Sequence, residues 1–84
     1  MAHHWPDGLA ITVQVDAEAM PLALRWQGKH HAVRWIVAMW RTDHGWWADH
    51  VQRDYYRLVT ESGYLLELYR DCLNEQWYLL RSYD

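Results

Sequence analysis

Arginine and aromatic side chains stand next to each other at five places in this sequence, where together they could bind a flat or anionic ligand. The pairs are RW at 25–26, RW at 34–35, WR at 40–41, YYR at 55–57 and YR at 69–70. A guanidinium can stack on an aromatic ring, and single-stranded nucleic acids are bound by aromatic rings together with arginines. The structural alternative is that these arginines cover the outer sides of core rings and pair with carboxylates on neighbouring strands.

The densest of these stretches, GWWADHVQRDYYR at 45–57, supplies most of the candidate contact surface. Adjacent residues of an extended strand point to opposite faces, so we expect each aromatic pair to place one ring in the core and the other outward. Outward rings and nearby arginines would form the surface that meets a partner. The candidate contact residues are Trp46, Trp47, Arg53, Tyr55, Tyr56, Arg57 and Arg70.

The distribution of charge argues against general nucleic-acid binding. The formal net charge is −3. Residues 1–24 contain Asp7, Asp16 and Glu18 but no Lys or Arg, which leaves eight of the eleven acidic residues to balance all eight basic ones in residues 25–84. Nonspecific binding to nucleic acid needs an excess of basic charge to displace the counterions of the phosphates. A single-stranded nucleic-acid-binding module is therefore the alternative function, and a protein-interaction module is the favoured one.

Neither a metal site nor a cofactor is indicated. Two of the histidine pairs, at 3–4 and 30–31, are adjacent in sequence, and neighbours on a strand point apart and cannot easily share one ion. Only His44 with Asp49 or His50 forms a loop grouping that deserves a test for metal binding. All four glycines are isolated, so no glycine-rich phosphate loop is present.

Catalysis is not indicated either, because a hydrolase or transferase needs a nucleophile beside a base or two carboxylates in a cleft. The acidic residues of the second half are scattered among arginines, with which we expect them to pair at or near the surface. We therefore predict no enzymatic activity, and we identify no small-molecule substrate.

The single cysteine, Cys72, excludes an intramolecular disulfide. The first residues, MAHHWPDGLA, lack a basic region followed by an apolar run, and no apolar run approaches the length that spans a membrane. These features predict a cytoplasmic protein without membrane contact.

The elements that must position the arginines and rings are short β-strands within one small domain. LAITVQVDA at 9–17 alternates as a first strand, and residues 21–41 predict a hairpin that turns at Gly28. Apolar residues occur at both parities of its second arm, HAVRWIVAMWR at 31–41, so we expect both faces of that strand to be covered. Seven Trp and six Tyr without any Phe suit the thin core of an 84-residue domain.

The second half of the chain fits two templates. Residues 64–76 could form a helix with an apolar stripe, or a strand that pairs with QWYLLRSYD at 76–84 across the polar turn CLNE. The turn-like TESG at 60–63 and the density of aromatic residues favour the strands.

Residues 20–84 resemble a small bacterial domain of unknown function that occurs alone or near the C-terminus of mutasome subunits, the inactive relatives of Y-family DNA polymerases. The stretches that carry this resemblance are PLALRWQGKHHAVRWIVAMWR, GWW, RDYYRLVTESGYLLELYRD and WYLLRSYD. The sequence departs from the pattern at DCLNEQW, where such domains more often carry a Gly before the Trp. The resemblance implies a mostly β domain and, by analogy, a docking role near DNA repair or translesion synthesis.

The sequence therefore predicts an all-β domain, a strongly bent antiparallel sheet or small open barrel of about five to six strands with at most one short helical turn. An N-terminal acidic segment, residues 1–19, would pack its strand on the sheet or extend it, and residues 20–84 would form the aromatic-rich β domain. The predicted function is a non-catalytic interaction or accessory module, with a protein partner or self-association and with nucleic acid as the alternative partner.

Overall fold

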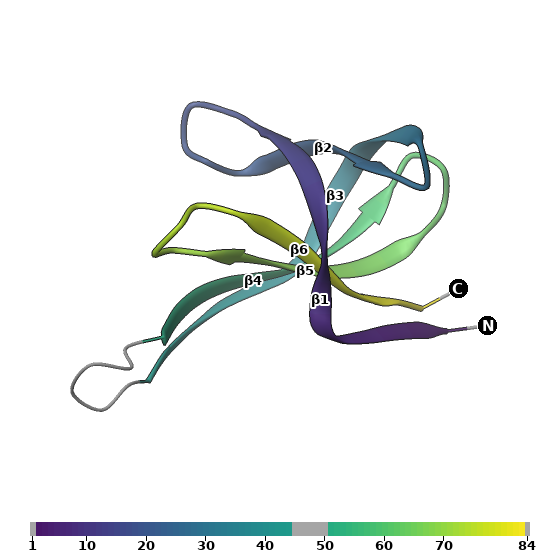
Figure 1. Cartoon of the computed structure of the whole chain (residues 1–84). Coiled ribbons are helices and arrows are strands. Elements are labelled where there is room, and N and C mark those ends of the chain that lie inside the picture. Colours follow the sequence, from purple (N-terminus) through teal and green to yellow (C-terminus); the bar gives the residue numbers. More distant parts are fainter. Residues whose placement is uncertain (1, 45–50, 84) are drawn as a thin grey trace.

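Six antiparallel strands and no helix make up the described part of the chain, residues 2–44 and 51–83, in a computed structural model (Figure 1). The strands are β1 (His3–Val15), β2 (Pro21–Trp26), β3 (Lys29–His44), β4 (Val51–Thr60), β5 (Leu65–Asp71) and β6 (Trp77–Ser82). Each pairs with its neighbours in sequence, and β6 also pairs with β1, so the sheet is ring-like. The all-β fold class is confirmed, and residues 65–71 form a strand, not a helix.

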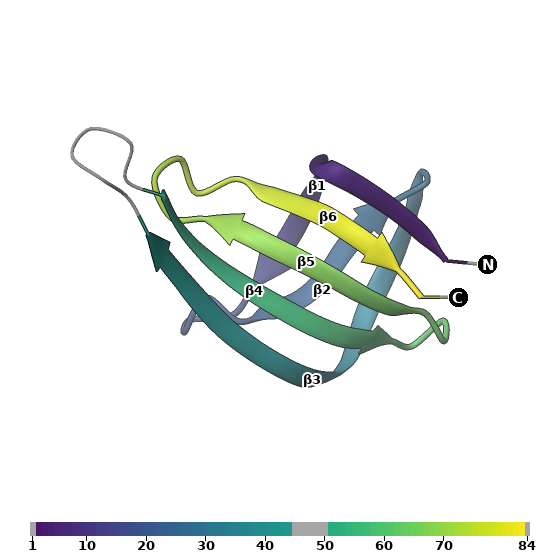
Figure 2. The same ribbon diagram turned by 90° about the horizontal axis from the view of Figure 1, so that it is seen from below.

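The ring consists of two parts that share β1 and β3. In the five-stranded part the order is β1-β6-β5-β4-β3, and in the three-stranded part it is β1-β2-β3. Residues 29–32 of β3 pair with β2, whereas residues 33–44 pair with β4. Figure 2 shows β3, β4, β5 and β6 side by side, with β3 at the margin of this part of the sheet.

Local turn chemistry explains the hairpins. Gln27 and Gly28 both have positive φ, 55° and 71°, as a two-residue turn between antiparallel strands requires, and the turn expected at Gly28 is confirmed. Between β5 and β6, the carboxylate of Asp71 accepts a hydrogen bond from the backbone N–H of Leu73 at 2.9 Å. The side-chain oxygen of Asn74 accepts one from the N–H of Gln76 at the same distance. Polar residues therefore fold the turn that CLNE predicted.

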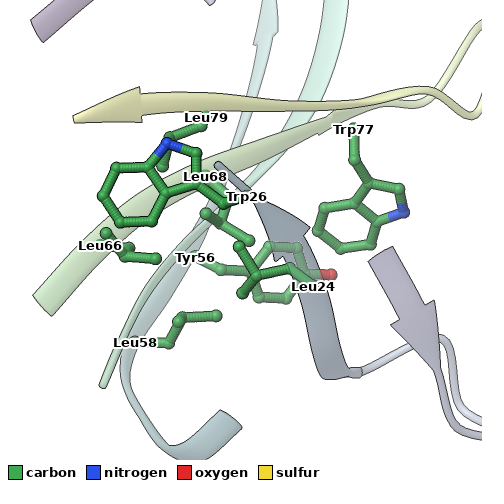
Figure 3. Close-up of a cluster of buried hydrophobic side chains, with 8 residues drawn as sticks. All are labelled: Leu24, Trp26, Tyr56, Leu58, Leu66, Leu68, Trp77 and Leu79. Carbon is green, nitrogen blue, oxygen red and sulfur yellow. The ribbon is translucent and has the colours of Figure 1, made fainter. Parts of the chain in front are cut away.

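The core lies inside the bend of the sheet and is built from leucines and aromatic rings (Figure 3). Residues 54, 56 and 58 of β4 alternate with outward-facing neighbours, and their cross-strand partners on β5 follow the same alternation. We call the side of the five-stranded part that faces this core the inner face and the opposite side the outer face. The core cluster consists of Leu24, Trp26, Tyr56, Leu58, Leu66, Leu68, Trp77 and Leu79.

The N-terminal segment supplies a whole strand of the ring. β1 is longer than the expected strand over 9–17, and it pairs with both β6 and β2. Its Trp5 ring packs edge-on against Trp26 at a centroid distance of 6.3 Å. The division expected between residues 19 and 20 falls in the turn that joins β1 to β2, where the Asp16 carboxylate accepts hydrogen bonds from the N–H groups of Glu18 and Met20.

The expectation that both faces of β3 are covered is wrong. Trp35, Val37 and Met39 are 52, 51 and 56 % exposed. The register with β4 shifts between Val33 and Trp35 and again between Ile36 and Ala38, so these apolar residues do not follow one alternating pattern. These three apolar side chains are thus left about half exposed to solvent.

Candidate functional site

The candidate contact residues lie on two faces of the sheet. Trp46 and Trp47 fall outside the described residues. Arg53, Tyr55 and Arg57 share the outer face, since they are two residues apart on β4.

Tyr56 and Arg70 belong to the inner face, where Tyr56 is 4 % exposed and packs against Trp77 at 5.2 Å between ring centroids. Tyr55 is only half-buried on the other side. The expected inward and outward division is therefore confirmed for the tyrosine pair, and the described candidate residues are distributed over both faces of the sheet.

A ladder of four rings crosses the outer face, one ring from each of β3, β4, β5 and β6. The Cα register sets these residues directly opposite one another in a single row. The first two rings are nearly parallel, with 5.4 Å between centroids and 3° between planes. The next two pairs follow at 5.6 and 4.9 Å. We call this row, Trp40, Tyr55, Tyr69 and Tyr78, the aromatic ladder.

Arginines lie over the ladder. The Arg53 guanidinium is 4.5 Å from the centre of the Tyr69 ring, and that of Arg57 is 5.5 Å from the Trp40 ring. Arg57 also donates to the Glu67 carboxylate at 3.2 Å, a contact that raises the pKa of the arginine. The Tyr83 hydroxyl donates to the same carboxylate at 2.7 Å. Both arginines therefore cover rings, and Arg57 also pairs with a carboxylate, as the structural interpretation expected.

A hollow of about 390 Å³ opens where the turn between β1 and β2 approaches β3. Its walls contain methionine and aromatic side chains together with acidic and basic ones. The lining residues are Glu18, Ala19, Met20, Met39, Trp40, Arg41, Asp54, Tyr55, Tyr56 and Arg70.

Three charged side chains of the hollow, Arg41, Asp54 and Arg70, form ion pairs. Arg41 donates to both oxygens of Asp54, at 2.5 and 3.1 Å, and this hydrogen bonding lowers the pKa of the Asp54 carboxyl against the opposing effect of burial. Arg70 donates to Glu75 at 3.0 Å. The Cys72 thiol approaches Asp54 at 3.5 Å, and burial, followed by this contact, raises the pKa of the thiol.

The free edge of β3 borders the hollow. Within the described ranges, the backbone of residues 33–42 pairs with β4 alone, so the opposite side of this stretch has no strand partner. Large exposed apolar side chains concentrate here. We call the stretch from Val33 to Thr42, with exposed Trp35, Val37, Met39 and Trp40, the β3 edge.

The histidines and other side chains of metal-binding types are spread over the described part of the chain. There, no group of three or more His, Cys, Asp and Glu side chains is placed to hold a metal ion. The grouping of His44 with Asp49 or His50 lies outside what can be described. His31 is buried, with its ring nitrogens 2.8 Å from the Ser62 hydroxyl and 3.3 Å from the Trp26 carbonyl oxygen. The described residues include no helix able to span a membrane.

Residues 9–84 match the model of a family described as Domain of unknown function (DUF6504). The chain belongs to this family. The DUF6504 match begins inside β1 and takes in every other strand of the ring. No curated protein and no solved structure matches the chain.

Three residues of the DUF6504 chain that matter for this surface were not among the sequence candidates: Trp40, Tyr69 and Tyr78. They join Tyr55 only through the cross-strand register. The register of β4 with β5 could have been derived from the turn at 61–63, which sets Tyr55 opposite Tyr69. The position of Trp40 opposite Tyr55 could not, because the sequence between His44 and Val51 does not indicate which residues of β3 and β4 stand opposite one another.

Proposed function

We propose that this protein is a non-catalytic interaction module that takes an extended segment of a partner protein along the β3 edge. The observation that carries the proposal is a stretch of backbone with no strand partner on one side, flanked by Trp35, Val37 and Met39, each about half exposed. An added strand would satisfy the edge N–H and C=O groups, and its alternate side chains would cover these apolar residues.

The hollow favours a thin occupant over a second folded domain. It lies between the β1–β2 turn at Ala19 and β3 at Arg41, so whatever enters must fit between a turn and a strand. Its volume of about 390 Å³ is of the order that one or two large side chains fill. Two acidic residues, Glu18 and Asp54, face two arginines, Arg41 and Arg70, so the walls are neutral and suit uncharged side chains.

A non-catalytic role is supported by the hydrogen bonds that the acidic side chains already make within the protein. Asp54 is held in a two-fold hydrogen bond by Arg41, and Glu67 accepts hydrogen bonds from Arg57 and Tyr83. A raised pKa keeps the Cys72 side chain in its thiol form at neutral pH, whereas a nucleophile needs the thiolate.

The partner, we further propose, belongs to DNA repair or translesion synthesis. Support comes from the resemblance of residues 20–84 to domains carried near the C-terminus of mutasome subunits, which is an argument by analogy. Overlapping peptides from mutasome proteins, arrayed and probed with the full chain, test it. Binding that Val37→Lys removes supports the assignment, and uniform failure of the array contradicts it.

The edge itself is tested by selecting displayed random peptides on the purified full chain and mapping the selected peptides by NMR. We expect bound peptides to shift the amide signals of residues 33–42 and to slow their hydrogen exchange. Val37→Lys places a charge on the edge and should weaken binding, because a lysine on an edge strand opposes pairing. Leu73→Lys is the matched control, since Leu73 is an exposed apolar residue in the turn between β5 and β6, two strands that do not pair with β3.

Two results would overturn the proposal. Peptides that bind without changing the β3 amides would place the contact elsewhere. A dimer that forms with rising concentration and is abolished by Val37→Lys would show that a second copy of the chain occupies the edge.

A further inference from the structure

We infer that the segment added to β3 carries an aromatic residue opposite Trp40, where its ring extends the aromatic ladder to a fifth member. This inference rests on the proposed function, and it names the chemistry of the partner. It concerns the outer face, whereas Met39, Arg41 and Tyr56, which line the hollow, belong to the inner face.

Trp40 is the open end of the ladder. Its ring is parallel to that of Tyr55 within 3°, with 5.4 Å between centroids, so one of its faces is directed at Tyr55. The other face is directed away from β4, past the unpaired side of β3. Trp40 is 37 % exposed although it belongs to a row of packed rings.

The opposite end of the ladder is closed by β1. A Cβ atom at Gly8 would lie 2.8 Å from the Cβ of Tyr78 and 3.1 Å from the Tyr69 ring, so the backbone of β1 packs directly on these rings. A side chain has no room there. The ladder can therefore grow only beyond Trp40.

A new strand repeats the geometry that already relates the four rings. In an antiparallel pair, directly opposite residues have Cβ atoms roughly 4.5–5.5 Å apart on the same face, and aromatic pairs at such positions stabilise the sheet. The residue opposite Trp40 is thus placed as Tyr55 is placed on the other side. An aromatic side chain there covers the exposed Trp40 face by offset stacking.

The positions beside this aromatic residue face the inner side. One lies opposite Met39, which is 56 % exposed and lines the hollow together with Met20 and Tyr56. An apolar side chain at that position would fill the hollow. The expected partner sequence is therefore an aromatic residue with an apolar residue on each side, which satisfies either direction of the added strand.

Two capped synthetic peptides test the inference: Lys-Thr-Val-Tyr-Val-Thr-Lys and the same peptide with Leu in place of Tyr. Each is titrated into the isotope-labelled full chain, and β3 amide shifts are followed. Because an aromatic pair contributes beyond the area it buries, we expect the Tyr peptide to bind about three- to tenfold more tightly. Trp40→Leu should remove this preference while both peptides still bind, and Val37→Lys should weaken both equally.

The outcomes separate this inference from the proposed function. Equal affinities of the two peptides, both mapped to β3, would overturn the fifth ring and leave strand addition intact. No binding by either peptide would contradict both. Labelled oligothymidylate serves as the other probe: salt-sensitive binding that Trp40→Leu abolishes would assign the Trp40 face to nucleobases and overturn the aromatic peptide residue.

Discussion

The two unpaired sides of the five-stranded part, along β1 and along β3, are built in opposite ways. Residues 3–11 of β1 pair with β6 alone, just as residues 33–42 of β3 pair with β4 alone. On β1 the register is interrupted between His4 and Leu9, within a stretch that contains Pro6, Asp7 and Gly8. On β3 the exposed residues are large and apolar.

This difference indicates that the β1 edge is protected against pairing with a further strand. Proline lacks the N–H that a new strand would need, a charged residue opposes pairing, and an irregular register misaligns the backbone. β1 combines all three within a few residues. β3 has register shifts too, but from Ala38 to His44 its pairing with β4 is regular. Its exposed residues Trp35, Val37, Met39 and Trp40 are apolar, which is why we assign the partner to this edge.

The largest effect is expected on the β1 side, from Gly8→Ala. Gly8 has a φ of 82°, and its Cβ would meet the Cβ of Tyr78 at 2.8 Å. Left-handed backbone together with overpacking should lower the free energy of unfolding by about 2–4 kcal/mol. Urea denaturation monitored by tryptophan fluorescence measures it.

Gly28→Ala is the matched control for this loss. Gly28 also has positive φ, 71°, but nothing lies within 4 Å of its Cβ position. Only the backbone contribution remains, about 1–2 kcal/mol. Equal losses in the two variants would show that β1 does not pack tightly on the ladder.

Lowering the pH should destabilise the pairing of β3 before it destabilises the pairing of β1. The folded-state pKa of Asp54 is lowered below its ordinary value of 3.8, chiefly by the hydrogen bond from Arg41. The stabilisation is therefore complete above that value and is lost as the pH falls through the folded pKa, an effect visible from about pH 5 downward. Hydrogen exchange of β3 amides, corrected for its intrinsic pH dependence, should accelerate more than that of β1 amides.

Asp54→Asn isolates this contribution, because an amide keeps the shape but cannot ionise. The variant should be less stable than the parent at neutral pH, and the gap should narrow in acid. A gap that is constant from neutral pH to about pH 3 would mean that the Arg41–Asp54 contact does not hold the edge strand.

The smallest stability effect is expected from Val37→Lys on the β3 edge. Val37 is 51 % exposed and lies at an irregularity of the register, so the free energy of unfolding should change by no more than about 0.5 kcal/mol. Thermal unfolding by circular dichroism measures this change. A loss of several kcal/mol would show that Val37 supports the fold and is not available to a partner.

Much of the fold could be predicted from turn residues and alternation. Gly28, the stretch at 61–63 and the polar CLNE turn fix three hairpins, and alternation along β4 places Tyr55 and Tyr56 on opposite faces. These features are local, since each depends on residues close together in the chain.

The rest depends on register over long distances. Nothing near Trp77 indicates that β6 pairs with a strand that begins at His3. Nothing near Val37 indicates the shift between Ile36 and Ala38 that places Trp35 and Met39 on different faces. The aromatic ladder combines the registers of three strand pairs. For the same reason, the exposure of β3 was not predicted. Apolar residues occur at both odd and even positions of this strand, and that pattern alone suggests that both faces are buried.

The pairing of β1 with β6 also bears on how the chain folds. Every other strand pair joins neighbours in sequence, whereas this one joins the first strand to the last, and the start of β1 lies beside the end of β6 (Figure 1). Closing so long a loop has the highest entropic cost of any contact in the sheet. We expect the hairpins to form first and the ring to close last, so the rate-limiting step of folding is the docking of β1, whose irregular backbone at Gly8 must fit against rings that are already stacked.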